Sequence, residues 1–204
     1  MLTHTGTVTL TTPRLILRRF RLDDAQAIYD NWGTDENVTK YLTGSVHESV
    51  SATGERLTKW IADYDHPETY HWAIEIDGVI VGKITLHMID NWSERCELGY
   101  CIGSKWWNRG IMTEAVAGVL RFAFEELNAH KICAQYDTEN IGSGKVMLKN
   151  GMKPEGVLRE HCVRKDGTRG DMACYAILKG AWETCANEAS AATANDVHTS
   201  SQFF

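Results

Sequence analysis

The feature that most constrains the fold of this chain is the stretch 71–88. Two apolar runs, 72–76 and 79–84, flank the pair Asp77-Gly78. Asp-Gly is the pair preferred in two-residue turns between antiparallel strands, because both turn positions need a left-handed backbone. The stretch therefore predicts a β-hairpin, and any fold for this chain must include an antiparallel sheet.

The remaining patterns alternate between strands and helices. A second Asp-Gly pair at 166–167 predicts a second hairpin. The other expected strands are 14–18, 96–102 and 131–137, and those of the second hairpin are 155–163 and 171–178. Apolar residues at helical spacing predict helices after a cap at Asp23, over 49–64, over 112–127 and over 140–150, where Asn150-Gly151 ends the last one. This order predicts an α/β (α+β) fold with a mixed, mostly antiparallel central sheet flanked by helices.

Composition places the chain among globular proteins and excludes several function classes. With 204 residues, 43% apolar and 24% charged, the chain suits one domain with a full core. The formal charge of −6 disfavours direct nucleic-acid binding. No run approaches the roughly 18 apolar residues of a membrane span, and the first residues lack a secretion-signal pattern, so we expect a cytoplasmic protein. We predict one domain over 1–183 and a low-complexity tail over 184–204, where Ala, Ser, Thr and Asn dominate.

Cysteine and histidine usage gives no sign of a structural metal. None of the six cysteines forms a C-x-x-C pair, and most stand in apolar, strand-like stretches. The eight histidines show no metal-ligand spacing. We therefore expect buried, reduced thiols and no bound metal.

The stretch 96–115 reads as a strand, a turn and the start of a helix. A turn that leads into a helix leaves several backbone N–H groups unpaired, and together with the helix dipole they form an anion site suited to phosphates. Gly110 allows a ligand to approach the backbone closely, and Arg109 adds a positive charge. A purely structural turn is the alternative for this stretch taken alone, since neither classical nucleotide-binding signature is present.

The segment 107–115 (WNRGIMTEA) resembles the coenzyme A-binding motif of the GNAT acetyltransferases, in the form found in the RimJ/RimL-like branch. Segment 12–18 (TPRLILR) resembles the start of the same family, and 140–143 (NIGS) with 148–156 (LKNGMKPEG) resembles its later part. Asp166-Gly167, followed by Asp171 and Tyr175, completes a match that spans residues 10 to 183. Two departures from the family pattern are Trp107 in place of Gln or Arg, and Met112 in place of Gly or Ala, which is bulky enough to crowd the turn.

This resemblance implies a GNAT-like acyl-CoA N-acyltransferase fold with acetyl-CoA as cosubstrate and no metal. It implies that the oxyanion is bound by backbone N–H groups near Tyr100 and Cys101, where the strand separates from its neighbour. The residues expected to contact acetyl-CoA are Tyr100, Cys101, Ile102, Trp107, Asn108, Arg109, Gly110, Ile111, Met112, Thr113, Asn140 and Ser143.

Acetyl transfer to an amine needs a base for the acceptor and a proton for the departing thiolate. Glu97, on an otherwise apolar strand, is the first candidate base, acting directly or through water; the alternative is a glutamate that faces solvent. Glu160 is the second candidate. Ser143 is the candidate proton donor, because the helix at 140–150 lacks the tyrosine that many family members use there. Asn140 is expected to cap that helix and could also contact the donor.

Three functions are open at this stage. The first is acetylation, by direct attack in a ternary complex, of a primary amine, with the N-terminal α-amine of a protein such as a ribosomal protein as the leading acceptor. The second is acetylation of a small molecule, such as a polyamine, an amino acid or an antibiotic. The third is a catalytically silent module that binds acetyl-CoA. A homodimer is a further expectation from the resemblance. The lack of a long apolar run predicts that the chain has no membrane partner.

Overall fold

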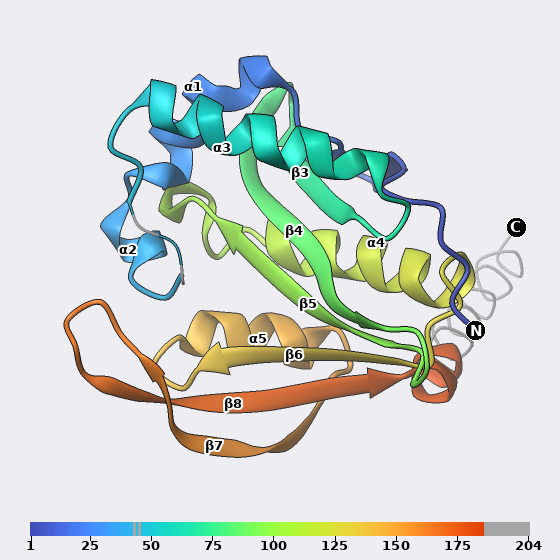
Figure 1. The fold of residues 1–204 in the computed structure, drawn as a ribbon. Helices are drawn as coiled ribbons and strands as arrows, with labels where there is room; N and C mark the ends of the chain where they lie inside the picture. Colours follow the sequence, from blue (N-terminus) through green and yellow to red (C-terminus); the bar gives the residue numbers. More distant parts are fainter. Residues whose placement is uncertain (43, 45, 186–204) are drawn as a thin grey trace, which may run out of the picture.

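The computed structural model describes residues 1–42, 44 and 46–185. One sheet of eight strands runs through it in the order β1-β2-β3-β4-β5-β6-β8-β7 (Figure 1). The strands are β1 (Leu10–Thr11), β2 (Ile16–Arg18), β3 (Tyr70–Ile76), β4 (Val79–Asp90), β5 (Arg95–Ile102), β6 (Lys131–Asp137), β7 (Lys153–Val163) and β8 (Arg169–Leu178). All neighbouring strands are antiparallel except β5 and β6. The predicted mixed, mostly antiparallel sheet is confirmed.

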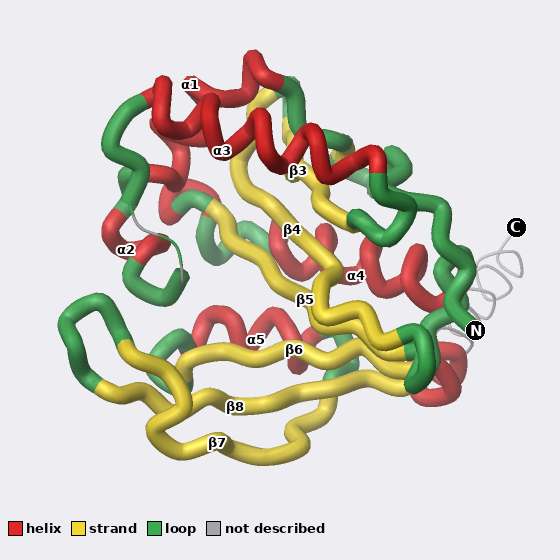
Figure 2. The backbone as a smooth tube through the Cα atoms, viewed as in Figure 1, coloured by secondary structure: helices red, strands yellow, loops and turns green. Residues whose placement is uncertain are grey.

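The helices lie on both faces of this sheet (Figure 2). They are α1 (Ala25–Ile28), α2 (Glu36–Thr39), α3 (Val50–Ala62), α4 (Ile111–Glu125) and α5 (Ile141–Lys149), and residues 179–185 also form helical turns. Helices α1 and α3 cover the half of one face that β3, β4 and β5 form, whereas α4 and α5 lie behind the sheet (Figure 1). The face of β6, β8 and β7 on the α1 and α3 side carries no helix among the described residues.

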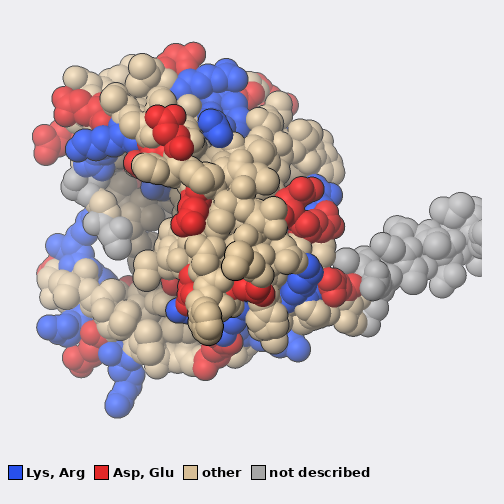
Figure 3. All heavy atoms as spheres, turned by 45° about the vertical axis from the view of Figure 1, so that its right-hand side comes forward, with Lys and Arg blue, Asp and Glu red and all other residues tan. Residues whose placement is uncertain are grey.

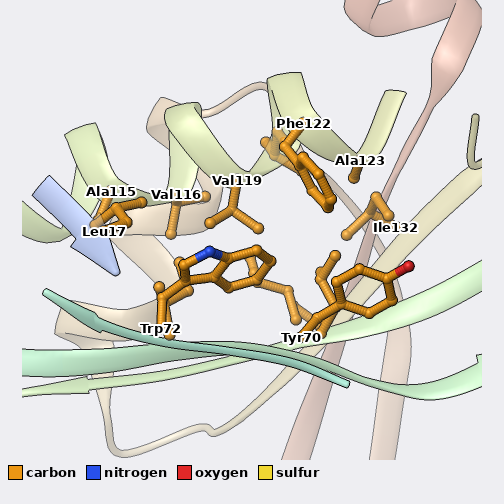
Figure 4. Close-up of a cluster of buried hydrophobic side chains, with 14 of the residues drawn as sticks. Leu17, Tyr70, Trp72, Ala115, Val116, Val119, Phe122, Ala123 and Ile132 are labelled. Atoms are coloured by element: carbon orange, nitrogen blue, oxygen red, sulfur yellow. The ribbon is translucent and has the colours of Figure 1, made fainter. Parts of the chain in front are cut away.

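The largest core lies between α4 and the sheet (Figure 4). Figure 4 shows Val116, Val119 and Phe122 of α4 pointing down onto Tyr70 and Trp72 of β3. The ring centroids of Trp72 and Phe122 are 5.5 Å apart, in an edge-to-face arrangement. Each large side chain removed from water contributes roughly 1.5–3 kcal/mol. This core therefore holds α4, and with it the turn that precedes α4, in a fixed position on the sheet.

A second, smaller cluster joins the sheet to α1 and α3. Its buried members are Phe20, Ile28, Trp32, Val38, Leu57, Ala73, Ile80 and Cys101. Because Cys101 belongs to this cluster while Leu98 and Ile102 belong to the larger one, alternate residues of β5 face opposite helix layers. Gly99 and Glu97 therefore lie on the same face of β5 as Cys101.

Most predicted elements are present, with small changes at their ends. The turn residues Asp77 and Gly78 have φ values of 50° and 76°, as the predicted hairpin requires. The expected helix after Asp23 differs: a single 3-10 turn at Leu22–Asp24 leads into the short α1 and a π-type turn at Tyr29–Gly33. The residue at the N-cap of α1 is Asp24 rather than Asp23, and its side chain accepts from no amide of α1. Asp24 Oδ2 instead accepts from the Arg21 amide at the start of the 3-10 turn and from the buried Arg18.

The predicted tail at 184–204 lies almost entirely outside the described residues. Trp182, just before it, packs on Phe124 with ring centroids 5.3 Å apart. None of the six cysteines is bonded to another, but only Cys96 and Cys101 are fully buried, and Cys185 is exposed, so the expectation of buried thiols is correct only in part. In the part of the chain that the structure describes, no helix has the length and apolarity to cross a bilayer.

Candidate active site

The sheet opens between β5 and β6. These parallel strands are paired only from Arg95↔Lys131 to Glu97↔Cys133. Beyond that point β5 stays paired with β4 as far as Ile102, and β6 stays paired with β8. The two strands therefore diverge after Glu97, and we call the space between them the splay (Figure 1).

Backbone amides of β5 point into the splay. Gly103 donates its N–H to the Val81 carbonyl on β4 at 3.0 Å. Since hydrogen bonds alternate along an antiparallel ladder, the N–H groups of Tyr100 and Ile102 point away from β4, toward the splay. The same alternation turns the Cys101 amide toward β4. Of the residues expected to offer donors here, the register favours Tyr100 and Ile102 and not Cys101.

The turn after β5 depends on close contacts that only glycine permits. A methyl group at Gly103 would lie 2.2 Å from the Asn31 carbonyl oxygen and 2.8 Å from the Trp106 ring. The indole N–H of Trp107 donates to the Ile102 carbonyl at 3.0 Å, which ties the turn to the end of β5. Gly110, the N-cap of α4, has a φ of 72°, a left-handed conformation that side chains disfavour.

Free amides gather at the start of α4. Within the described residues, the backbone N–H groups of residues 108–113 donate to no backbone or side-chain acceptor. Residues 108–110 are exposed, so these donors are open to an anion, and the positive end of the α4 dipole adds to their field. The side chain of Met112 is 6% exposed and packs in the core beneath α4, so it does not crowd the turn.

A network from the N-terminal segment supports this turn. Glu114 accepts from Thr12 Oγ1 at 2.6 Å, from the Arg14 amide at 2.8 Å and from Arg14 Nε at 2.5 Å. Arg14 also donates to the Arg109 carbonyl at 3.1 Å. Burial by itself would raise the pKa of Glu114, but the hydrogen bonds from Thr12 and Arg14 outweigh it, and the pKa lies below its usual value. The sequence shows segments 12–18 and 107–115 as separate motifs and does not show that they are in contact.

Ser143 is hydrogen-bonded to Tyr100 across the splay. Its hydroxyl donates to Tyr100 Oη at 2.9 Å, and Tyr100 Oη donates to the Ser143 carbonyl at 3.0 Å. Burial raises the pKa of Tyr100 to about 12. Asn140 caps α5 as predicted, accepting from the Ser143 amide at 3.4 Å. The phenol of Tyr100 was missed from the sequence, where Tyr100 was considered only for its backbone.

Neighbouring segments narrow the splay on either side. Gly144 lies against the Tyr136 ring: a methyl group there would sit 2.5 Å from the Tyr136 hydroxyl. The rings of Tyr136 and Tyr175 are 5.7 Å apart, so aromatic side chains line the α5 side of β6 and β8. On the other face, the Tyr41 hydroxyl donates to the Glu139 carbonyl at 3.4 Å, which links the segment after α2 to the loop before α5.

Glu97 lies at the closed end of the splay, on the face opposite α4. It is half-buried. It lines a hollow of ≈ 340 Å³. The residues around this hollow are Met88, Ile89, Asp90, Arg95, Cys96, Glu97 and Cys133. The alternative candidate Glu160 is exposed on the edge strand β7, three strands away from β5, or roughly 14 Å at the usual strand spacing.

A wider hollow separates the part of the molecule that carries α1 and α3 from the part that carries β7 and β8 (Figure 3). Both acidic and basic side chains flank its mouth, and basic ones gather on the side of the β7–β8 hairpin. The described residues contain no group of His, Cys, Asp or Glu side chains that could hold a metal ion. The arrangement is an anion site, an opening through the sheet and a carboxylate beyond it.

Comparisons with known proteins agree with this geometry. Residues 14–153 match the family model described as an acetyltransferase (GNAT) domain. The chain is 33% identical over 172 residues to the uncharacterized N-acetyltransferase YoaA of Bacillus subtilis, covering 83% of this chain and 96% of that protein. It is 25% identical to the ribosomal protein uS5-alanine N-acetyltransferase of Escherichia coli, with 86% and 93% covered. A GNAT-family acetyltransferase structure from Bacillus anthracis superposes with a TM-score of 0.74 at 26% identity, with 85% and 99% covered.

Proposed function

Because this chain belongs to the GNAT family of acetyl-CoA-dependent N-acetyltransferases, we propose that its acceptor is the N-terminal α-amine of a protein, such as a ribosomal protein. The observation that carries this proposal is the open face beyond the splay. The side of β6, β8 and β7 that faces away from α4 and α5 carries no helix among the described residues (Figure 2). In our proposal an extended chain lies along this face and brings its N-terminus to Glu97. The similarity to a ribosomal-protein acetyltransferase and the RimJ/RimL-like motif at 107–115 support the same acceptor.

The donor would occupy the splay and the turn that follows it. The amides of residues 108–113, with the exposed Arg109, would bind the diphosphate of acetyl-CoA. Tyr100 and Ile102 would offer their N–H groups to the thioester oxygen, which becomes the oxyanion. Trp107 and Asn140 hold the two ends of the site in shape through the contacts described above.

The reaction would proceed by direct attack in a ternary complex. The neutral amine attacks the thioester carbonyl, a C–N bond forms, and the C–S bond breaks. The proton that the acceptor loses passes to Glu97, directly or through an intervening group. The thiolate receives a proton from the hydroxyl pair of Ser143 and Tyr100. Holding the two reactants together in this geometry is worth a large part of the barrier, roughly 7–11 kcal/mol in favourable cases.

A screen of acceptors tests this proposal, with release of coenzyme A thiol as the measurement. The set contains a peptide with a free N-terminus, the same peptide with a blocked N-terminus and an internal lysine, a polyamine, and free amino acids. We expect turnover with the free N-terminus and little with the others. A preference for a polyamine or an amino acid would replace the proposed acceptor with a small molecule.

Two variants separate an enzyme from a silent binding module. Glu97→Gln and Ser143→Ala should each lower kcat by roughly 10²–10⁴, the range typical of general acid–base groups. Glu97→Gln should leave the affinity for coenzyme A unchanged, because Glu97 is not among the residues expected to contact the donor. Ser143→Ala, at a residue expected to contact acetyl-CoA, should retain coenzyme A binding and lower kcat far more than affinity. Absence of turnover by the unaltered chain on every acceptor, with coenzyme A binding intact, would favour the silent module.

A further inference from the structure

His87 of β4 lies directly opposite Glu97 of β5. The two residues are partners in the antiparallel register of these strands. Directly opposed residues carry their side chains on the same face, with Cβ atoms about 4.5–5.5 Å apart. His87 is exposed and Glu97 is half-buried, so the imidazole is the more accessible of the two groups.

The imidazole of His87 is turned toward the start of the splay. A methyl group on Gly99 would lie 3.0 Å from His87 Nε2 and 3.3 Å from its Cδ2. Gly99 is two residues beyond Glu97 and lies on the same face of β5. It is the first residue of this face that has no pairing partner on β6. The ring therefore occupies space that a side chain at Gly99 would fill, next to where the reacting carbonyl would lie.

Neither group is engaged elsewhere in the protein. Across the residues that the structure describes, no hydrogen bond or ion pair involves a ring nitrogen of His87 or the carboxylate of Glu97. By contrast, His4 bonds to Tyr70 and Asn91, and His47 bonds to Thr53. An imidazole and a carboxylate that face one opening without partners are free to act on a substrate.

The other titratable groups on this face leave His87 as the accessible imidazole. They include His71 on β3, Lys83 on β4, Arg95, Glu97 and Cys101 on β5, Lys131 and Cys133 on β6, and Cys174 on β8. Arg95 is paired with Asp90 and Lys131 with Glu155. Burial, with a smaller contribution from Lys83, lowers the pKa of His71 to about 3, so His71 stays neutral and its ring is packed between Phe20 and Trp60. Burial also raises the pKa of Cys101 and of Cys133, so both thiols stay protonated.

We propose that His87 is the intervening group between the acceptor amine and Glu97. His87 would take one proton from the acceptor ammonium, and the Glu97 carboxylate would hold the resulting imidazolium in place. The neutral amine then forms the C–N bond as the C–S bond breaks, and the second proton of the attacking nitrogen passes through the hydroxyl pair of Ser143 and Tyr100 to the departing thiolate. The imidazolium releases its proton to water after the product leaves. Imidazole suits this step because its ordinary pKa is nearer to neutral pH than that of a carboxylate. The inference rests on the proposed function and names one residue of its acceptor side.

The first test compares His87→Gln with His161→Gln, a matched control at an exposed histidine on β7. We expect His87→Gln to lower kcat/KM by roughly 10²-fold or more, with the acid limb of the pH–rate profile lost and the affinity for coenzyme A unchanged. Added imidazole should restore part of the activity of His87→Ala. His161→Gln should behave as the unaltered chain.

A double-mutant cycle tests the geometry. Gly99→Ala should displace the imidazole and lower kcat/KM in the unaltered chain, but should add little when His87 is already Gln. If Gly99→Ala lowers kcat/KM equally in the unaltered chain and in His87→Gln, the new methyl group acts on the substrate directly. The position of the His87 imidazole then has no role in the loss. Normal activity and an unchanged pH profile for His87→Gln would overturn the inference. In that case loss of activity in Glu97→Gln would leave Glu97 as the base without His87, whereas two active variants would remove both residues from the reaction. The acceptor screen tests the proposed function independently of either variant.

Discussion

At the scale of single residues, the proposed donor side of the site is made mostly of backbone, and few side chains would touch the reacting atoms. The free amides of residues 108–113 and the inward-facing amides of Tyr100 and Ile102 need no particular side chain. The Tyr100 and Ser143 hydroxyls are the exception, since each is the hydrogen-bond partner of the other residue. In the proposed reaction, protonation of the leaving thiolate would therefore depend on a pair whose members are 43 positions apart in the sequence.

Tyr100→Phe tests this pair. Without the phenol, the Ser143 hydroxyl loses its partner, and we expect kcat to fall by roughly 10-fold or more with coenzyme A affinity unchanged. The double variant with Ser143→Ala should be little worse than Ser143→Ala alone, because the two hydroxyls act as a unit. With a pKa of about 12, the Tyr100 phenol stays protonated at neutral pH, so the unaltered chain should show no basic limb from this group below about pH 11. Fully additive losses would show that the hydroxyls act separately.

At the scale of elements, the segment before β2 is joined to α4 by Arg14 and Glu114. This contact spans 100 positions and connects two stretches that the sequence shows only as separate motifs. Arg14 reaches past Glu114 to the Arg109 carbonyl, so the pair fixes the turn as well as the helix. The Glu114 side chain is 17% exposed, so water partly screens its charge.

Glu114→Gln should weaken both the fold and the donor site. The folded-state pKa of Glu114 is lowered, so its contribution to stability is present above the unfolded value near 4.5 and is lost as pH falls through the folded value. The difference in unfolding free energy between the two chains, measured with urea at several pH values, should therefore shrink below about pH 4.5. A difference that grows on acidification would contradict this assignment. Glu125→Gln, at an exposed position near the end of the same helix, is the control.

The features that could be predicted from the sequence are those that depend on residues close together along the chain. The Asp77-Gly78 hairpin and the turn at Gly110 were predicted because glycine conformation is a local property. Helix α4 was placed to within two residues by its apolar spacing. The separation of β5 from its neighbour was expected from the family resemblance alone, and the structure places the last pair at Glu97. The π-type turn at Tyr29–Gly33 and the Tyr100–Ser143 contact could not be predicted, because each depends on packing between distant segments.

At the scale of the whole molecule, the sheet is both the scaffold and the passage between two substrates. The antiparallel strands β1 to β4 and the helices on both faces hold β5 rigidly, while β6 follows β8 and β7 away from it (Figure 1). The proposed anion site lies at the far end of β5 and Glu97 near its start, so in this proposal donor and acceptor would approach the same space from different sides. One claim supports this view: the amides at the start of α4 hold the diphosphate of acetyl-CoA.

Calorimetric titration of coenzyme A into the unaltered chain, Gly110→Ala and Gly78→Ala tests that claim most directly. Both glycines have a φ above 70°, so either alanine should cost about 1–2 kcal/mol of folding stability, but only Gly110 lies at the anion site. We predict saturable binding of one coenzyme A per chain, roughly tenfold weaker or worse in Gly110→Ala and unchanged in Gly78→Ala. Folded, unaltered protein that gives no saturable heat with coenzyme A, or equal affinities in all three chains, would contradict the account.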